Sequence, residues 1–183
     1  YKKLMYNDFL LVGPPDDPAD VLSSPLVEVA VQRIVEHRAS FVSRGDESGT
    51  HTRERQLFTL AGVTLFPEQT VVSGQGMSRT LRLASELEAY TLTDAATFMA
   101  MNQVLCLQPV FQGGTNLLNT YSVISSTMNP NEASRADTRS LIGWLTDGGG
   151  RELIKGFGLS SGVPAFAVWP VGSPRDQPED LPF

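Results

Sequence analysis

The sequence predicts an α/β fold, and three observations support this prediction. Short apolar, β-prone runs alternate along the chain with segments whose apolar residues recur at helical spacing. Gly, Pro, Asn and Asp occupy most of the junctions between them. With 183 residues and 41% hydrophobic content, the chain can bury a core in one domain or in two small lobes. Alternation of this kind is typical of buried strands covered by helices.

The chain begins with a strand followed by a helix. Residues 9–12 form an apolar run that ends at Gly13-Pro14-Pro15, and we expect this strand to be buried on both faces. Apolar residues then recur at helical spacing up to about residue 38. We expect Ser24 to cap this helix and Pro25 to occupy its first position.

The next segment has the order strand, tight turn, helix. Residues 41–42 are a short β-prone pair, and Gly45-Asp46 is a turn signal. A helix is predicted from about residue 49 to residue 60, with Ser48 or Asp46 as its cap and Gly62 just beyond its end.

The remaining elements follow from the same signals. Strands are predicted near residues 71–72, 90–92, 110–111 and 121–125, and helices near residues 77–87, 94–105, 131–146 and 151–155. Cys106 lies inside an apolar helical run, so we expect it to be buried. The chain after residue 158 is rich in proline and is expected to be an extended tail.

Composition excludes several classes of function. The formal net charge is −6 and the basic residues are scattered, which argues against a broad nucleic-acid interface. The two histidines and the single cysteine form no cluster at metal-ligand spacing, so we expect neither a metal site nor a cofactor. No apolar run approaches the roughly 20 residues of a membrane span, so direct membrane insertion is not expected.

The start of the helix near residue 49 has the chemistry of an anion site. A helix N-terminus offers free N–H groups and the positive end of the helix dipole. Here it is flanked by Arg44 and by the hydroxyl groups of Ser43, Ser48 and Thr50. Guanidinium, hydroxyl and amide donors together can surround an oxyanion. A capped surface helix beside a solvated arginine is the alternative interpretation.

An enzymatic interpretation of the same residues is also open. Ser48 and His51 lie one helical turn apart with Asp46 nearby, which suggests a hydrolase. The sequence around Ser48 is not a Gly-x-Ser-x-Gly elbow, and triad residues usually come from separated segments. A phosphate loop is excluded because no lysine follows Gly49.

Several motifs, in this order, resemble those of a known family. They are Tyr6-Asn7-Asp8-Phe9 with Val12-Gly13-Pro14, Ser43-Arg44-Gly45-Asp46-Glu47-Ser48-Gly49-Thr50-His51, Gly74-Gln75-Gly76-Met77, Tyr90-Thr91-Leu92-Thr93-Asp94, and Ile142-Gly143-Trp144-Leu145-Thr146. Together they resemble the substrate-binding proteins of tungstate ABC transporters, and the similarity spans nearly the whole chain.

The resemblance implies a type II periplasmic-binding-protein fold, with two α/β lobes, a ligand cleft and two crossing strands. Such proteins capture a tetrahedral oxyanion, tungstate or molybdate, and deliver it to ABC permease subunits without chemistry. A monomer in the periplasm, or secreted, is therefore expected. The family's N-terminal Thr/Ser-rich segment has no counterpart here, so the first lobe is expected to be incomplete. An anion-sensing domain without transport is a further alternative.

By the same resemblance, residues 1–12 would end lobe 1 and include a crossing strand. Residues 13–120 would form lobe 2, and residues 121–183 would contain the returning strand and the rest of lobe 1. Arg44 and Thr50 match the family's ligand-binding residues. The neighbouring candidates are Ser43, Ser48 and Gly49, with Tyr90 as a further one. Asp46 is expected to cap and brace the loop, since a carboxylate would repel an oxyanion.

Overall fold

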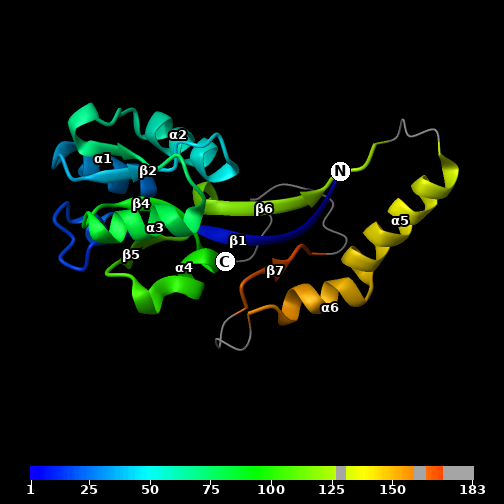
Figure 1. Ribbon diagram of the computed structural model, residues 1–183. Coiled ribbons are helices and arrows are strands. Elements are labelled where there is room, and N and C mark those ends of the chain that lie inside the picture. Colours follow the sequence, from blue (N-terminus) through cyan, green and yellow to red (C-terminus); the bar gives the residue numbers. More distant parts are fainter. Residues whose placement is uncertain (127–130, 159–163, 171–183) are drawn as a thin grey trace. The chain divides into compact units, whose positions relative to one another are not determined.

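The computed structural model describes residues 1–126, 131–158 and 164–170. The chain divides into two compact units: unit 1 comprises Tyr1–Asn7 with the described part of Leu118–Phe183, and unit 2 comprises Asp8–Leu117. Figure 1 shows strands and helices in both units. The predicted α/β class is confirmed.

Unit 2 is organised around the second half of β1 (Lys2–Gly13). On one side β1 pairs antiparallel with β4 (Thr91–Asp94), and on the other with β5 (Gln108–Gln112). The side chains of residues 9–12 are at most 6% exposed, so the predicted burial of this strand on both faces is confirmed. The strand extends beyond the apolar run in both directions.

The other strands of unit 2 run parallel to one another. β2 (Phe41–Ser43) pairs in parallel with β3 (Thr70–Val72). A parallel bridge between Phe41 and Tyr90 places β2 beside the start of β4. The amide of Val42 donates to the carbonyl oxygen of Tyr90 at 2.8 Å. The carboxyl ends of β3, β2 and β4 therefore lie along one edge.

Helices connect these strands. The α-helices of unit 2 are α1 (Val27–Glu36), α2 (Gly49–Ala61), α3 (Met77–Glu86) and α4 (Ala95–Met101). Short 3-10 helices occupy Val21–Ser23, Pro67–Gln69, Asn102–Val104 and Thr115–Leu117. In Figure 1, α1 and α2 lie side by side and pack together, and α3 packs on α4.

The main core lies in unit 2, where strands meet helices. The large side chains that are completely or almost completely buried include Leu11, Ile34, Phe41, Leu81, Tyr90 and Leu92. The rings of Phe41 and Phe58 pack edge to face with centroids 5.2 Å apart. Burial of side chains of this kind contributes roughly 1.5–3 kcal/mol each. The start of β2 is thus anchored in the buried core of the unit.

Unit 1 contains the first half of β1 and further elements from the end of the chain. β6 (Leu118–Val123) pairs with β1, and β7 (Ala167–Val168) pairs with it antiparallel. α5 (Glu132–Asp147) has Asn131 as its N-cap and is followed by α6 (Gly149–Gly156). These helices pack against each other (Figure 1).

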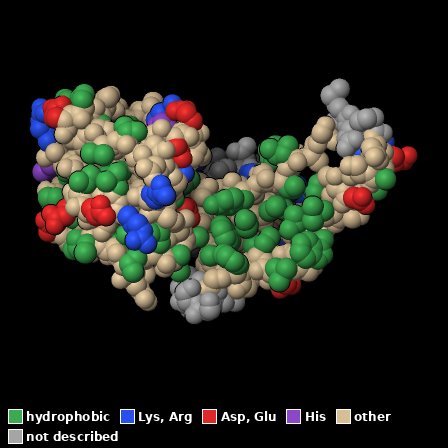
Figure 2. Space-filling view, in the orientation of Figure 1, with side chains coloured by type: hydrophobic (Ala, Val, Ile, Leu, Met, Phe, Trp, Pro, Cys, Tyr) green, Lys and Arg blue, Asp and Glu red, His purple; other side chains and the backbone are tan. Residues whose placement is uncertain are grey.

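Apolar side chains remain exposed in unit 1. Figure 2 shows them gathered over β7, α6 and the end of α5. Four large apolar residues in α5, α6 and the position after α6 are at least 46% exposed. They are Leu141, Trp144, Leu153 and Phe157. The described part of unit 1 has a small buried cluster of Leu118 and Trp169. Unit 2 therefore holds the larger core.

The prediction that Ser24 caps the first helix is wrong. The helix begins at Val27 with Leu26 as its N-cap. Ser24 instead ends the 3-10 helix Val21–Ser23, and its backbone is extended. The chain therefore enters the α-helix only after Pro25.

The prediction of a buried Cys106 is also wrong, since this residue is exposed. α4 ends at Met101, the 3-10 helix Asn102–Val104 follows, and Leu105 is extended. Cys106 therefore lies outside the helical run that was expected to bury it. Its amide donates to Ser85 Oγ at 2.8 Å.

The end of the chain differs from its prediction in part. α5 ends at Asp147 and Gly148 is extended, but α6 already starts at Gly149, two residues before the predicted start at Arg151. Most of the proline-rich tail lies outside the described residues. Within residues 164–170 the structure has β7, which the sequence does not predict.

Candidate functional site

Helix N-termini gather at the edge where the parallel strands end. β2 leads into α2, β3 into α3 and β4 into α4. The amide of Ser73 donates to the carbonyl oxygen of Ser43 at 2.9 Å, and the amide of Gly74 donates to that of Arg44 at 3.0 Å. The loops after β2 and β3 are thus joined. Ligands of open α/β sheets bind at such an edge.

The first turn of α2 has free donors. Ser48 is the N-cap, and its Oγ accepts from the amide of His51 at 3.3 Å, which confirms the predicted cap. The amide of Thr52 donates to the Ser48 carbonyl oxygen at 2.9 Å. Among the described residues, the amides of Gly49 and Thr50 have no acceptor, as expected for the first positions of a helix. These two N–H groups and the helix dipole favour an anion.

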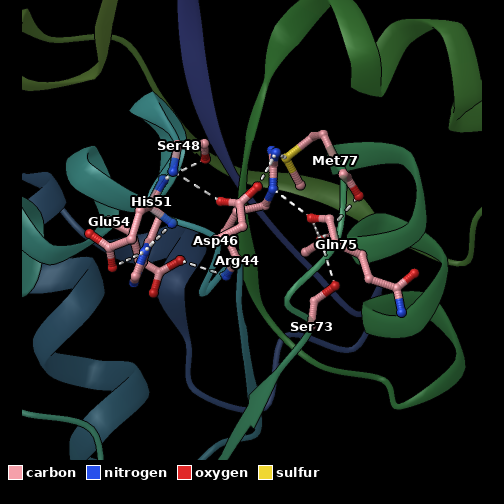
Figure 3. Close-up of polar contacts among 11 residues, drawn as sticks. Arg44, Asp46, Ser48, His51, Glu54, Ser73, Gln75 and Met77 are labelled. Atoms are coloured by element: carbon pink, nitrogen blue, oxygen red, sulfur yellow. Dashed lines mark hydrogen bonds and ion pairs between the residues drawn. The ribbon is translucent and has the colours of Figure 1, made fainter.

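Arg44 lies beside this helix start with its guanidinium group held in place (Figure 3). Its Nε donates to the carbonyl oxygen of Gln75 at 2.8 Å. One terminal nitrogen donates to Asp46 Oδ2 at 2.7 Å, and the other is 3.4 Å from Met77 Sδ. The side chain is 12% exposed. These contacts use three of the five guanidinium N–H groups, so two remain to receive a ligand.

Asp46 braces the loop, as predicted. Its Oδ1 accepts from the amide of Ser48 at 3.1 Å, while Oδ2 accepts from Arg44. Burial opposes its ionisation, but the hydrogen bonds from Ser48 and Arg44 and the arginine charge outweigh it, so the pKa of Asp46 is lowered. The ionised carboxylate stabilises the fold above the pKa of an unfolded aspartate. This contribution is lost as the pH falls through the lowered folded-state pKa.

Glu54 lies under the same loop and is 4% exposed. Its Oε1 accepts from Ser43 Oγ, and its Oε2 accepts from the amide of Arg44 at 3.0 Å. Burial raises the pKa of Glu54, although these two hydrogen bonds oppose the effect. Sequence reasoning missed this residue, because Arg53 and Arg55 flank it and suggest a solvated helix face.

The geometry of Ser48 and His51 does not form a catalytic pair. Nδ1 of His51 accepts from the amide of Glu47 at 3.1 Å and lies 3.3 Å from Glu47 Oε1. The contact between Ser48 and His51 instead runs from the His51 amide to Ser48 Oγ. A hydrolase needs the imidazole to face the nucleophile. The observed bond is a helix cap.

Two of the predicted ligand residues have buried side chains. Tyr90 is fully buried, and its hydroxyl accepts from the amide of Ala19 at 3.0 Å and donates to Asp17 Oδ1 at 2.8 Å. Ser43 is 7% exposed and donates to Glu54. Both hydroxyl protons are thus donated to carboxylates of the protein, so these two side chains have no hydroxyl proton left to donate to a ligand.

A surface hollow of about 410 Å³ adjoins the loop that contacts Arg44. It is lined by Gln75, Gly76, Met77, Ser78 and Arg79.

In the described part of the chain, no group of three or more His, Cys, Asp or Glu residues is arranged to hold a metal ion. Within residues 1–126, 131–158 and 164–170, no helix combines the length and hydropathy needed to cross a membrane.

The family follows from comparison with known proteins. The family model described as PBP superfamily domain matches residues 1–148. The chain belongs to the PBP superfamily. The family resemblance predicted from the motifs is confirmed at the level of the superfamily. The α/β periplasmic-binding-protein fold that it implies is confirmed as well.

Within this superfamily the chain is similar to tungstate-binding proteins. It is 37% identical over 170 residues to the tungstate-binding protein TupA of Peptoclostridium acidaminophilum, covering 90% of this chain and 59% of that protein. The crystal structure of the tungstate ABC transporter from Geobacter sulfurreducens shares 36% identity with a TM-score of 0.71, covering 85% of this chain and 67% of that one. The structure of the tungstate binding protein TupA from Desulfovibrio alaskensis G20 shares 33% identity with a TM-score of 0.77. The match covers 92% of this chain and 69% of that one.

The matched relatives are longer than this chain. The chain spans 59% of the Peptoclostridium protein and 63% of the tungstate-binding protein TupA of Campylobacter jejuni, to which it is 30% identical. The similarity therefore covers most of this chain and a part of each of these two relatives.

Proposed function

We propose that this chain is part of an extracytoplasmic solute-binding protein that captures a tetrahedral oxyanion for an ABC transporter. The ligand is tungstate, by similarity to relatives named as tungstate-binding proteins. Molybdate has the same charge and shape and is the second candidate. The protein binds and releases its ligand as a monomer without changing it, and delivers it to permease subunits.

The observation that carries this proposal is the position of Arg44 beside the start of α2. A guanidinium that is 12% exposed and held by three contacts needs little reordering to bind an anion. The uncommitted amides of Gly49 and Thr50 add donors at the positive end of a 13-residue helix. The Thr50 and Ser48 hydroxyl groups lie on the same first turn.

The donors of this set favour a fully deprotonated anion. Both oxygens of the nearby Asp46 carboxylate already accept hydrogen bonds, so the loop offers few acceptors to a ligand. Phosphate carries a proton near neutral pH, and that proton needs an acceptor in the site. A site built of donors therefore selects against phosphate. Tungstate and molybdate carry no such proton at this pH.

The arrangement of the chain in the whole protein belongs to the same proposal. Residues 13–120 form one lobe, and residues 1–12 and 121–183 contribute crossing strands and part of the other lobe. The protein acts in the periplasm or outside the cell.

Titration calorimetry with tungstate, molybdate, sulfate and phosphate tests the proposed function. We expect the first two to bind and to displace each other, and phosphate to bind much more weakly. The absence of heat with both tungstate and molybdate, measured on folded protein, would contradict the proposal.

Replacing Ser48 by alanine separates binding from hydrolysis. We expect tungstate affinity to fall by about 1–2 kcal/mol, because the variant loses the helix cap and a hydroxyl group beside the anion. A hydrolase would instead lose all turnover of a chromogenic ester or phosphate substrate. The comparison uses both assays on the unaltered chain and on Ser48→Ala. Turnover that depends on Ser48, with unchanged anion affinity, would refute the binding role.

A further inference from the structure

Glu54 has a buried carboxylate that bonds to the loop after β2 at Ser43 and Arg44, and the proposed function does not use it. It belongs to α2 but points at the end of β2. Its two oxygens hold two consecutive residues, the Ser43 hydroxyl and the Arg44 amide. It thereby joins the helix whose start would bind the anion to the strand whose end carries the arginine.

The partners of this carboxylate are unusual for a buried charge. Both donors are neutral, and no ion pair of Glu54 occurs in the described part of the chain. His51 and Arg55 on α2 act on it only through longer-range attraction. A buried carboxylate with this set of partners is costly to keep. A hydrophobic residue would fill the space at lower cost, unless the two hydrogen bonds are needed.

We propose that Glu54 is the positioning residue of the anion site, which fixes the main chain at Ser43 and Arg44 so that the guanidinium and the start of α2 converge. This inference rests on the proposed function. The side chain of Arg44 bonds to its own partners. Glu54 instead accepts from the main-chain amide of Arg44, and this bond fixes the position from which the side chain extends. Binding groups must be held within about 0.5 Å of the productive geometry, so a shift at the Arg44 amide is transmitted to the ligand.

Replacing Glu54 by glutamine tests the two hydrogen bonds apart from the negative charge. Its Oε1 can accept from the Arg44 amide, and its Nε2 can donate to Ser43 Oγ, because a hydroxyl group both donates and accepts. Glu54→Gln therefore keeps the link and removes a negative charge from the neighbourhood of the anion. Glu54→Ala breaks the link and leaves both donors without their acceptor.

The test compares tungstate affinity by calorimetry in the unaltered chain, Glu54→Gln and Glu54→Ala. We expect Glu54→Gln to bind at least as tightly as the unaltered chain. Glu54→Ala is expected to bind about 10- to 100-fold more weakly, by analogy with the outer-shell residues that orient the ligands of metal sites. Equal affinity in all three proteins, or a loss in Glu54→Gln as large as in Glu54→Ala, would overturn the proposal.

Gln69→Ala is the matched control. Gln69 is also 4% exposed, and its side chain bonds to Ile34, Ala39 and Phe66 at the opposite end of β3. We expect its removal to lower the free energy of unfolding while leaving affinity unchanged. A comparable loss of affinity in Gln69→Ala would show that lower stability alone explains the weaker binding of Glu54→Ala. This result would refute the positioning role.

A measurement without ligand distinguishes failure of this inference from failure of the proposed function. Hydrogen exchange of the Arg44 amide, followed by NMR, reports its bond to Glu54 directly. We expect protection in the unaltered chain and in Glu54→Gln, and faster exchange in Glu54→Ala but not in Gln69→Ala. Unchanged exchange in Glu54→Ala would overturn the inference even if tungstate does not bind.

Discussion

Replacing Arg44 by alanine is expected to weaken tungstate binding by about 2–5 kcal/mol, which corresponds to roughly 30-fold to several thousandfold in Kd. Among the proposed ligand residues Arg44, Ser48, Gly49 and Thr50, only Arg44 has a fixed positive charge, and the variant loses it together with both uncommitted guanidinium N–H groups. It also leaves Asp46 without its ion-pair partner, so an unneutralised carboxylate faces the anion. Titration calorimetry at constant ionic strength measures the change.

Arg44→Lys is the control for charge. A lysine retains the positive charge but not the planar fork that contacts Asp46, Gln75 and Met77. We expect an affinity between those of the unaltered chain and Arg44→Ala. Thermal unfolding of both variants establishes that they are folded. Tungstate affinity that survives in Arg44→Ala would place the anion elsewhere on the molecule.

Replacing Tyr90 by alanine is expected to lower the free energy of unfolding by about 3–5 kcal/mol. The side chain is fully buried, and its ring fills the space beside Gly13, where an added Cβ would lie 2.4 Å from the ring. The hydroxyl also satisfies the amide of Ala19 and donates to Asp17. Chemical denaturation monitored by circular dichroism measures the loss.

Tyr90→Phe separates the hydroxyl group from the ring. The ring stays in place, while the Ala19 amide loses its acceptor, so we expect a smaller loss of about 1–3 kcal/mol. Because Tyr90 has its side chain in the core, tungstate affinity should be unchanged in Tyr90→Phe under conditions where the protein is folded. A loss of affinity without a loss of stability would show that Tyr90 does contact the ligand.

Local signals in the sequence predicted much of the site. The serine cap, the turn at Gly45 and the terminal Gly62 depend on neighbours within a few residues, so Ser48 caps α2 as expected and Gly62 ends it with φ +68°. The brace by Asp46 is also local, since it links residues 44 and 48. Local chemistry of this kind is readable from the chain order.

Long-range contacts could not be predicted in this way. Tyr90 looks like a strand-end residue that could face a ligand, but its ring packs beside Gly13 and its hydroxyl bonds to Asp17 and Ala19, all more than 70 positions away. Glu54 looks like a surface charge until β2 is packed against α2. In both cases the partner lies on another element, and the spacing along the chain carries no signal for it.

The measurement that tests the central claim most directly is an NMR titration of the amide groups at the start of α2 with tungstate. We expect the amide resonances of Gly49 and Thr50 and the Nε resonance of Arg44 to shift together and saturate at one equivalent. Amides at the other end of the helix, near Gly62, serve as the internal control and should not move. Binding of tungstate without shifts at Gly49, Thr50 and Arg44 would contradict the assignment of the anion site.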